Sequence, residues 1–387
     1  MHITIAIPTF NRFEQLKRCV QSIQSQSIDD EIRVSIAISN TASSDNTYAY
    51  LSTLKEAGGN FFITNEIGAD TKRNLGSLAE TIPSDSDWVW LMGDDDYLFS
   101  PHSISIVHDT ISAASDADLA FVHACQARRS ARSENMFENK VLNLCEEFGY
   151  HEMLGWFSSI IVRRDIFVPA LQNTQERFRS CDSETSAFAH SAEFLKLLHD
   201  KPGVFVDYPL VEPQDDEMTV ETVQRWLQDN MAERYFYVVN DIIRMGEEGV
   251  FTDRLPSTFF RYHSYCLWDR LIAAQLNSLK AFKAKSGETK RHAFLQSFSA
   301  NWDRIGKLCG LVREPQVRKY LNMTMHNALG VSMRFLNGEM SQQELEDAVK
   351  EQVMMFNAPA FVFDVLHQQR ELITAASSAL PLSKINH

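Results

Sequence analysis

Three consecutive carboxylates, Asp94, Asp95 and Asp96, have the type and spacing that most clearly point to chemistry. They follow the apolar run 88–92 and a single glycine. Like charges held within a few ångströms repel one another, so such a triplet needs a counter-charge. Mg2+ and Mn2+ take oxygen ligands and commonly bind through one or two carboxylates together with phosphate oxygens. The triplet therefore predicts a divalent-cation site for a diphosphate, and the alternative is that its members cap the following turn.

Apolar residues on either side of the triplet alternate between strand spacing and helix spacing. Short apolar runs predict strands over 3–7, 32–38, 61–63, 88–92, 119–122, 160–162 and 204–206. Helical spacing predicts helices over 13–23, 70–82, 104–111 and 186–199. This alternation is typical of βαβ units around a mostly parallel sheet. Ligands of open α/β sheets bind at the carboxyl ends of the strands, where we expect the triplet to lie.

The pattern changes beyond Pro213, where strands give out and longer helical segments follow. Helices are predicted over 223–245, 262–282 and 342–356. We therefore expect an α/β domain over residues 1–212 and an α-helical C-terminal region over residues 213–387.

The composition argues against several classes of protein. The chain has 387 residues and a formal net charge of −14, which argues against nonspecific binding to nucleic acid. Its six cysteines form no CxxC pair, which favours a reducing, cytoplasmic setting over a zinc knuckle or a disulfide framework. No apolar run approaches the roughly 18 residues of a spanning helix, so any membrane contact is expected to be peripheral. A dehydrogenase or a sugar nucleotidyltransferase would need a glycine-rich turn, and the turn over 8–12 contains no glycine.

Four segments in order, each expected at the end of a strand, resemble the signature of family 2 glycosyltransferases with the GT-A fold. They cover residues 5–12, 39–47, 65–74 and 93–96, the last being a Gly-Asp-Asp-Asp variant of the family's Asp-x-Asp motif. The resemblance extends over roughly the first 210 residues. It implies a Rossmann-like nucleotide-sugar-binding domain and an inverting, Mn2+- or Mg2+-dependent transferase. It also implies a nucleotide-diphospho-sugar donor, a glycan or lipid-linked acceptor, and a role in bacterial surface polysaccharide (capsule or O-antigen) biosynthesis.

The resemblance also implies roles for individual residues. Asn40 stands where the family usually places an aspartate that bonds the base. Because an amide both donates and accepts, UDP- or dTDP-sugar donors are favoured, and the alternative is a turn residue bonding its own backbone. Lys72 and Arg73 would approach the diphosphate, unless they are solvated charges of a helix face. The implied donor-binding residues are Pro8, Thr9, Asn11, Arg12, Asn40, Lys72, Arg73, Asn74, Asp94 and Asp95, and the implied metal ligands are Asp94, Asp95 and Asp96.

An inverting transfer by single displacement needs a general base for the acceptor hydroxyl. The family usually supplies an acidic residue late in the GT-A domain, and the candidates here are Asp182, Glu184, His190 and Glu193. We favour His190, because a subset of the family with the Gly-Asp-Asp-Asp motif looks similar here, with Phe-x-His after a serine-rich strand. Glu193 lies three residues away on the same helical face and would orient its imidazole. The alternative is a histidine buried in the wall of the domain.

Two questions stay open in the sequence. The first is whether the protein is an enzyme. The alternative is a noncatalytic nucleotide-sugar or partner-binding protein that retains the GT-A fold. The second is the role of the C-terminal helices, for which we consider a homodimer contact, contact with a lipid-linked acceptor at the inner face of the membrane, and a cover over the site.

Overall fold

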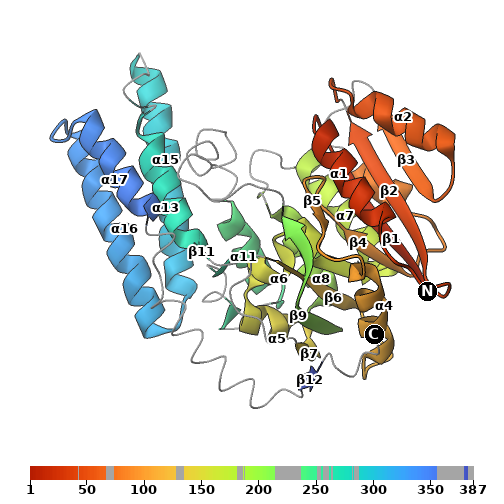
Figure 1. The fold of residues 1–387 in the computed structure, drawn as a ribbon. Helices are drawn as coiled ribbons and strands as arrows, with labels where there is room; N and C mark the ends of the chain where they lie inside the picture. The colour runs from red at the N-terminus through yellow and green to blue at the C-terminus, as the bar shows by residue number, and fades with distance from the viewer. Residues whose placement is uncertain are drawn as a thin grey trace.

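The computed structural model of the protein describes residues 1–41, 43–66, 74–127, 135–180, 186, 188–213, 237–250, 254–255, 261–262, 265–280, 282, 287–354 and 379–381. An α/β domain makes up its first part, and a group of long helices stands beside that domain (Figure 1). None of the helices in the described part of the chain combines the length and apolar character of a membrane span.

The first part of the chain alternates strands and helices, as the apolar spacing predicts. The elements are β1 (His2–Thr9), α1 (Phe13–Gln24), β2 (Arg33–Thr41), α2 (Thr47–Ala57), β3 (Phe61–Glu66), α3 (Asn74–Thr81), β4 (Trp88–Leu91), β5 (Asp96–Leu98) and α4 (Ser103–Ala113). The helix expected from residue 70 is described only from Asn74 onward, because 67–73 lie outside the described residues.

The second part of the domain mixes antiparallel strands with helices. Its elements are β6 (Phe121–Gln126), β7 (Asn135–Lys140), α5 (Val141–Phe148), α6 (Tyr150–Leu154), a 3-10 turn (Phe157–Ser159), β8 (Ile160–Arg163), α7 (Arg164–Ser180), α8 (Ala189–Leu198) and β9 (Pro202–Pro213). The apolar pattern predicts none of the helices α2, α5, α6 and α7, nor the strands β5 and β7. Pro169 is the sixth residue of α7, past the first turn, so it removes one intrahelical N–H donor, yet the helix continues through it to Ser180.

The C-terminal region is mainly helical, as expected. Its elements are α11 (Val238–Glu247), β10 (Arg261–Tyr262), β11 (Tyr265–Cys266), α13 (Leu267–Ser278), α15 (Glu288–Leu311), α16 (Pro315–Leu336), α17 (Gln342–Met354) and the short β12 (Ala379–Pro381). The helix expected over 262–282 starts later, because the antiparallel pair of β10 and β11 takes up its first residues. Of the helix expected over 223–245, the structure describes only the part within α11.

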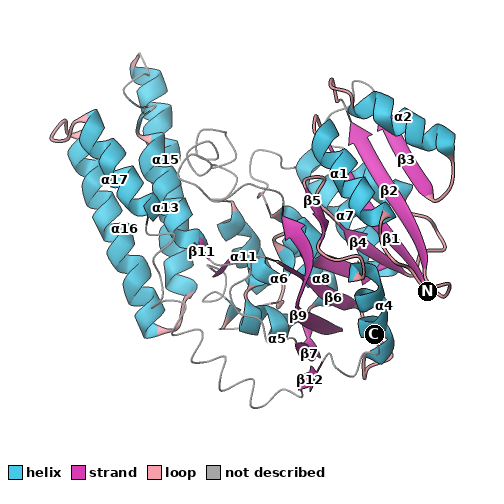
Figure 2. Ribbon diagram, viewed as in Figure 1, coloured by secondary structure: helices cyan, strands magenta, loops and turns pink. Residues whose placement is uncertain are grey.

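One sheet runs through the domain (Figure 2). Its strand order is β12-β7-β9-β6-β8-β4-β1-β2-β3, with β5 paired to β9. The strands β3, β2, β1 and β4 are parallel, whereas β8 is antiparallel to both β4 and β6. The carboxyl ends of β1, β2 and β4 therefore meet at one edge of the sheet, which is the edge that the sequence predicts for the site.

Alternation of side chains along the strands explains how helices cover both faces. In β1, the isoleucines at 3, 5 and 7 belong to one apolar cluster with Leu16 and Val20 of α1. Ala6 points the other way and belongs to a second cluster with Leu78 of α3 and helix α7. Because β1 is buried on both faces, it reads as a nearly continuous apolar run.

The second apolar cluster also joins the helical region to the α/β domain. It includes Val238, Ile242 and Met245 of α11 together with Phe194 and Leu198 of α8. The same cluster continues into α13, α15, α16 and α17. The predicted boundary near residue 212 coincides with the end of β9, but an apolar core spans it.

Candidate functional site

The acidic triplet lies in the turn between β4 and β5, at the carboxyl edge of the sheet. The amide of Met92 donates to the carbonyl oxygen of Ala6 at 2.9 Å, which keeps the chain beside β1 past the end of β4. The amide of Asp96 then donates to the carbonyl oxygen of Gly93 at 3.2 Å and closes the turn. The aspartates thus stand next to the last residues of β1.

Asp94 is buried against the end of β1. Its carboxylate accepts hydrogen bonds from the hydroxyl of Thr9 at 2.8 Å and from Nη1 of Arg12 at 3.0 Å. The same guanidinium nitrogen forms an ion pair with the more exposed Asp95. Burial raises the pKa of Asp94 to about 6, and the charge of Arg12 opposes the rise.

Asp96 is held by residues from the turn before β8. Oγ of Ser158 donates to its carboxylate at 2.5 Å, and the side chain of Trp156 also hydrogen-bonds it. Ser158 Oγ accepts from the amide of Gly93 at 2.8 Å, so one hydroxyl connects both ends of the acidic turn. Burial, reinforced by the negative charge of Asp95, raises the pKa of Asp96 well above its ordinary value.

The glycine where the triplet begins leaves room for two carboxylates. A Cβ on Gly93 would lie 2.8 Å from Oδ2 of Asp96 and 2.9 Å from Oδ1 of Asp95. Both distances are too short for non-bonded atoms, so a side chain here would push the carboxylates out of the turn. The glycine thus allows two carboxylates to fold back over the end of β4.

The loop after β1 is fastened to the loop after β2. Asn11 has a φ of 52°, which asparagine adopts more easily than most residues. Its amide donates to Oγ of Ser43 at 2.9 Å, and its Oδ1 accepts from the amide of Ser44 at 2.7 Å. Asp45 accepts from the amides of Phe13 and Thr47, the first residues of α1 and α2, at 3.0 Å each. These contacts fix the backbone from which Arg12 reaches the aspartates.

The side chain of Asn40 is buried beneath the loop after β2 and is not exposed to solvent. Its side chain is fully buried; Nδ2 donates to Oδ1 of Asn65 at 2.7 Å, and Oδ1 accepts from Oγ of Ser43 at 2.6 Å. The alternative that it bonds its own backbone is therefore not what the structure has. A contact between Asn40 and a base stays a prediction.

The remaining expected donor-binding residues divide into two groups. Pro8, the last but one residue of β1, is half-buried. Asn74 begins α3 and donates from Nδ2 to the carbonyl oxygen of Thr9 at 2.9 Å, and its buried Oδ1 has no partner among the described residues. Lys72 and Arg73 lie outside the described residues.

His190 is enclosed in the wall of the domain. Its side chain is nearly buried, Phe157 meets its ring edge-on at 4.6 Å between centroids, and burial lowers its pKa to about 3. It hydrogen-bonds the backbone at Leu154 and Gly155. These are the surroundings of a neutral imidazole and agree with the alternative weighed for this residue.

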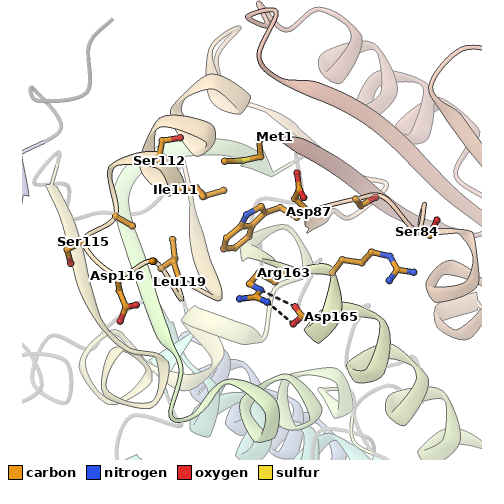
Figure 3. A pocket seen from close by; sticks show the side chains of 15 residues that line it. Met1, Ser84, Asp87, Ile111, Ser112, Ser115, Asp116, Leu119, Arg163 and Asp165 are labelled. Carbon is orange, nitrogen blue, oxygen red and sulfur yellow. Dashed lines mark hydrogen bonds and ion pairs between the residues drawn. The ribbon is translucent and has the colours of Figure 1, made fainter.

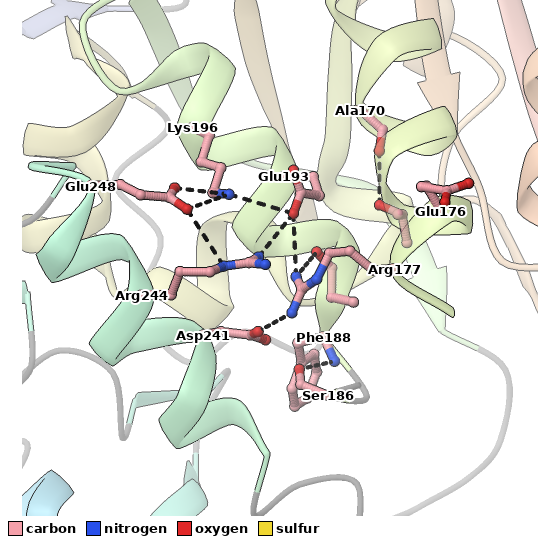
Figure 4. A network of polar contacts seen from close by, with 12 residues as sticks. Ala170, Glu176, Arg177, Ser186, Phe188, Glu193, Lys196, Asp241, Arg244 and Glu248 are labelled. Atoms are coloured by element: carbon pink, nitrogen blue, oxygen red, sulfur yellow. Dashed lines mark hydrogen bonds and ion pairs between the residues drawn. The ribbon is translucent and has the colours of Figure 1, made fainter. Parts of the chain in front are cut away.

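Glu193 does not orient His190, contrary to the sequence-based expectation. Its carboxylate forms ion pairs with Arg177 at 3.3 Å and with Arg244 at 3.0 Å (Figure 4). Arg177 also pairs with the buried Asp241 of α11. The position of α11, which periodicity in α8 alone does not reveal, turns Glu193 toward these cations. Asp182 and Glu184 lie outside the described residues.

A divalent cation fits the acidic turn only in part. Within the described part of the chain, no group of three or more histidine, cysteine or acidic side chains is arranged to hold a metal ion. Arg12 stands between Asp94 and Asp95, and Asp96 turns toward Ser158. The turn therefore suits a cation held by its carboxylates and completed by phosphate oxygens, not a complete protein cage.

A hollow of about 850 Å3 lies at the opposite, amino end of β1 and β4 (Figure 3). Arg163 and Arg164, a basic pair in the sequence, line it. Arg163 is paired with Asp165 at 2.9 and 3.1 Å, and Arg164 donates to the carbonyl oxygen of Pro83 at 2.8 Å. Arg163 is thus neutralised by a neighbouring carboxylate, whereas Arg164 is held by a backbone oxygen.

Comparison with known proteins assigns the α/β domain. Residues 4–164, from β1 to the start of α7, match the sequence model of glycosyl transferase family 2. This region is a family 2 glycosyltransferase domain. The acidic turn, the loop after β1 and Ser158 all lie within the matched residues, so the candidate site belongs to the part of the chain that carries the family's pattern.

The chain matches no curated protein. Among solved structures, TarS 1–349 of S. aureus in complex with UDP has 11% identity and a TM-score of 0.46, covering 87% of this chain and 92% of that one. The mannosyltransferase PcManGT of Pyrobaculum calidifontis, in complex with GDP-Man and Mn2+, has 12% identity and a TM-score of 0.44, covering 86% of each chain. Mannosyl-3-phosphoglycerate synthase of Rubrobacter xylanophilus has 15% identity and a TM-score of 0.40, covering 65% of this chain and 76% of that one.

Sequence reasoning gave no donor or metal role to two residues of the candidate site, although Asp45 lies in the segment 39–47 and Ser158 lies just before the strand expected over 160–162. Ser158 belongs to it because β8 runs antiparallel to β4, which a pattern of apolar runs does not reveal. Asp45 belongs to it because it joins the starts of two helices. Its place in a polar loop just before a helix was the available signal.

Proposed function

We propose that the protein is a metal-dependent, inverting glycosyltransferase. It would move a sugar from a nucleotide-diphospho-sugar to a glycan or lipid-linked acceptor. The observation that supports this best is the burial of Asp94 and Asp96 in a turn beside Thr9 and Arg12, at the carboxyl edge of a family 2 domain. Buried carboxylates are costly, and such groups gather where a protein binds charged ligands.

The residues of the turn have distinct tasks in this proposal. Asp95, the most exposed of the three, and Asp94 would contact Mn2+ or Mg2+, with Asp96 as a further ligand that Ser158 positions. Such an ion, when bound, supplies a Lewis acid that stabilises charge on the leaving diphosphate. The guanidinium of Arg12 would bind phosphate oxygens, because it presents several donors in a fixed plane. Thr9 and Asn74 would orient the ribose and the sugar.

The acceptor hydroxyl must lose a proton to a base on the chain. His190 and Glu193 remain candidates, although the first is enclosed and the second is engaged with arginines. Asp182 and Glu184 are the other candidates from the sequence. We favour them because the first two are enclosed or already paired. A variant series at the four positions, with transfer rate and donor affinity measured separately, would identify the base.

Several finer features belong to the proposal. They are UDP- or dTDP-sugars as donors, a role in bacterial surface polysaccharide biosynthesis, and action in the cytoplasm at the inner face of the membrane. A homodimer through the C-terminal helices is a further part of it. A noncatalytic nucleotide-sugar binder is the second candidate. The guanidinium of Arg12 favours it, because it occupies Asp94 and Asp95, the carboxylates that a metal ion would need.

The test is release of nucleoside diphosphate. The protein is incubated with Mn2+ and, in turn, UDP-, dTDP- and GDP-sugars, with and without glycan acceptors. We expect release with at least one donor, and its loss with EDTA or in Asp96→Asn. Metal-dependent nucleotide binding without release from any pair would favour the noncatalytic binder. Absence of both would contradict the proposed function.

A further inference from the structure

Arg12 lies where a bound cation would neutralise the acidic turn. Its Nη1 is 3.0 Å from Oδ1 of Asp94 and also contacts Asp95. Among the described residues, the guanidinium has no other hydrogen-bonding or ion-pair partner. The side chain of Arg12 is 46% exposed and that of Asp95 is 39% exposed, so solvent reaches this pair. The pair can therefore separate without opening the core.

The backbone under Arg12 is better fixed than its side chain. Asn11 is bonded to the loop after β2, and the amide of Phe13 is bonded to Asp45. The guanidinium, by contrast, is held by two carboxylates that would themselves contact a metal ion. The ion pair with Asp95 is exposed and weak, so a ligand can replace it, whereas the carboxylate of Asp94 lies deeper and is only 9% exposed.

We propose that Arg12 is a built-in counter-ion that competes with the divalent cation for Asp94 and Asp95. Free metal ions then bind weakly, because each must displace a guanidinium. A nucleoside diphosphate removes this penalty, since its phosphate oxygens accept the displaced guanidinium while they complete the coordination of the metal. Metal and donor binding are thus coupled, and by linkage each increases the affinity for the other by the same factor.

This inference rests on the proposed function, but it makes a prediction that needs no donor. Removing the guanidinium should strengthen binding of free Mn2+, since nothing then competes for the carboxylates. A residue that only bound the donor, or only stabilised the turn, would leave free Mn2+ binding unchanged or weaken it. The direction of the effect therefore separates a competitor from both of those roles.

The experiment measures Mn2+ affinity by the electron paramagnetic resonance signal of unbound Mn2+, with and without UDP. We compare the unmodified chain with the variants Arg12→Gln, Arg12→Lys and Arg33→Gln. The circular dichroism spectrum of each variant is first checked to be unchanged. Arg33→Gln is the matched control. It removes the same charge from an arginine that pairs with Asp85 at 2.6 Å, at the amino end of β2.

We expect Arg12→Gln to bind free Mn2+ at least fivefold more tightly than the unmodified chain, and to gain less from UDP. Arg33→Gln and Arg12→Lys should bind free Mn2+ like the unmodified chain. Equal or weaker binding of free Mn2+ by Arg12→Gln, including no measurable binding by either protein, would overturn the inference. Failure of the proposed function would appear separately, as a lack of any UDP effect in the unmodified chain.

Discussion

The hydroxyl of Ser158 donates a 2.5 Å hydrogen bond to the buried carboxylate of Asp96, although 62 positions separate the two residues in the sequence. The same hydroxyl accepts from the amide of Gly93, and the indole nitrogen of Trp90 donates to the carbonyl oxygen of Ser158 at 2.9 Å. The turn before β8 and the turn after β4 are therefore one polar unit. A substitution in the turn before β8 should therefore alter the acidic turn after β4.

Ser158→Ala should weaken both stability and nucleotide binding. It leaves the carboxylate of Asp96 and the amide of Gly93 without their shared partner, which costs about 1–3 kcal/mol of unfolding free energy. We expect metal-supported UDP affinity to fall roughly tenfold as Asp96 loses its position. Ser332→Ala is the control, because it removes a buried hydroxyl that bonds within α16. Equal effects of the two changes on UDP binding would count against the role given to Ser158.

Gly93→Ala should abolish nucleotide binding, because the added methyl group would displace the carboxylates of Asp95 and Asp96. Overpacking of this kind costs about 1–3 kcal/mol of stability. Gly306→Ala is the matched change: a Cβ at this position within α15 meets nothing within 4 Å. It should leave binding unchanged and raise the unfolding free energy by up to about 1 kcal/mol. Isothermal titration calorimetry with UDP and Mn2+ measures the affinity, and urea denaturation measures the stability. Normal UDP affinity in Gly93→Ala would contradict this prediction.

His190 should make the protein sensitive to acid. Its pKa falls to about 3 in the folded chain because burial disfavours the charged ring. Below pH 6.5 the unfolded chain gains a proton at this position that the folded chain does not. The free energy of unfolding therefore decreases as the pH is lowered. By pH 4 the loss is about 3 kcal/mol. Urea denaturation at pH 7 and pH 4 should therefore show His190→Gln losing about 3 kcal/mol less than the unmodified chain.

The same histidine can be followed directly by its proton resonances during a pH titration. A ring that stays neutral down to pH 4 agrees with the structure. A midpoint near 6.5 would mean that His190 is accessible, and would restore it as the favoured base.

Arg177→Met should destabilise the contact between α11 and the glycosyltransferase domain. Arg177 lies between Glu193 and Asp241, whose side chains are 6% and 2% exposed, and removing it leaves both acids short of a partner. Breaking a buried pair on one side costs about 3–5 kcal/mol. Glu248→Gln, at a 39% exposed carboxylate in the same network, should change the unfolding free energy by less than about 1 kcal/mol. Similar losses for the two variants would show that the network is not buried in solution.

Much of the fold could be predicted from local apolar spacing. Strand β1 with Ile3 and Ile5, and helix α1 with Leu16 and Val20, are visible because each buries a face with its own period. Helix α7 is not, because Pro169 interrupts its pattern. The three residues of β5 are too few to show any period, and they form a strand because β9 pairs with them.

The site could be predicted where it depends on one segment and not where it depends on several. The positions of Asp94 and Thr9 follow from their places at the ends of adjacent strands. The burial of Asn40 depends on contacts with Asn65 and Ser43, and the partners of Glu193 depend on α11. Local sequence carries no information about such partners, which explains why the pairing of Glu193 with His190 was wrong.

The central claim is that the acidic turn holds a divalent cation against the donor diphosphate. The most direct test is calorimetric titration of UDP, dTDP and GDP into the unmodified chain and into Asp96→Asn, with Mn2+ or with EDTA. We predict that at least one nucleotide binds the unmodified chain at least tenfold more tightly with Mn2+, and that Asp96→Asn loses this gain while its folded spectrum is unchanged. Equal affinity with Mn2+ and with EDTA for every nucleotide, or a full Mn2+ effect in Asp96→Asn, would contradict the account.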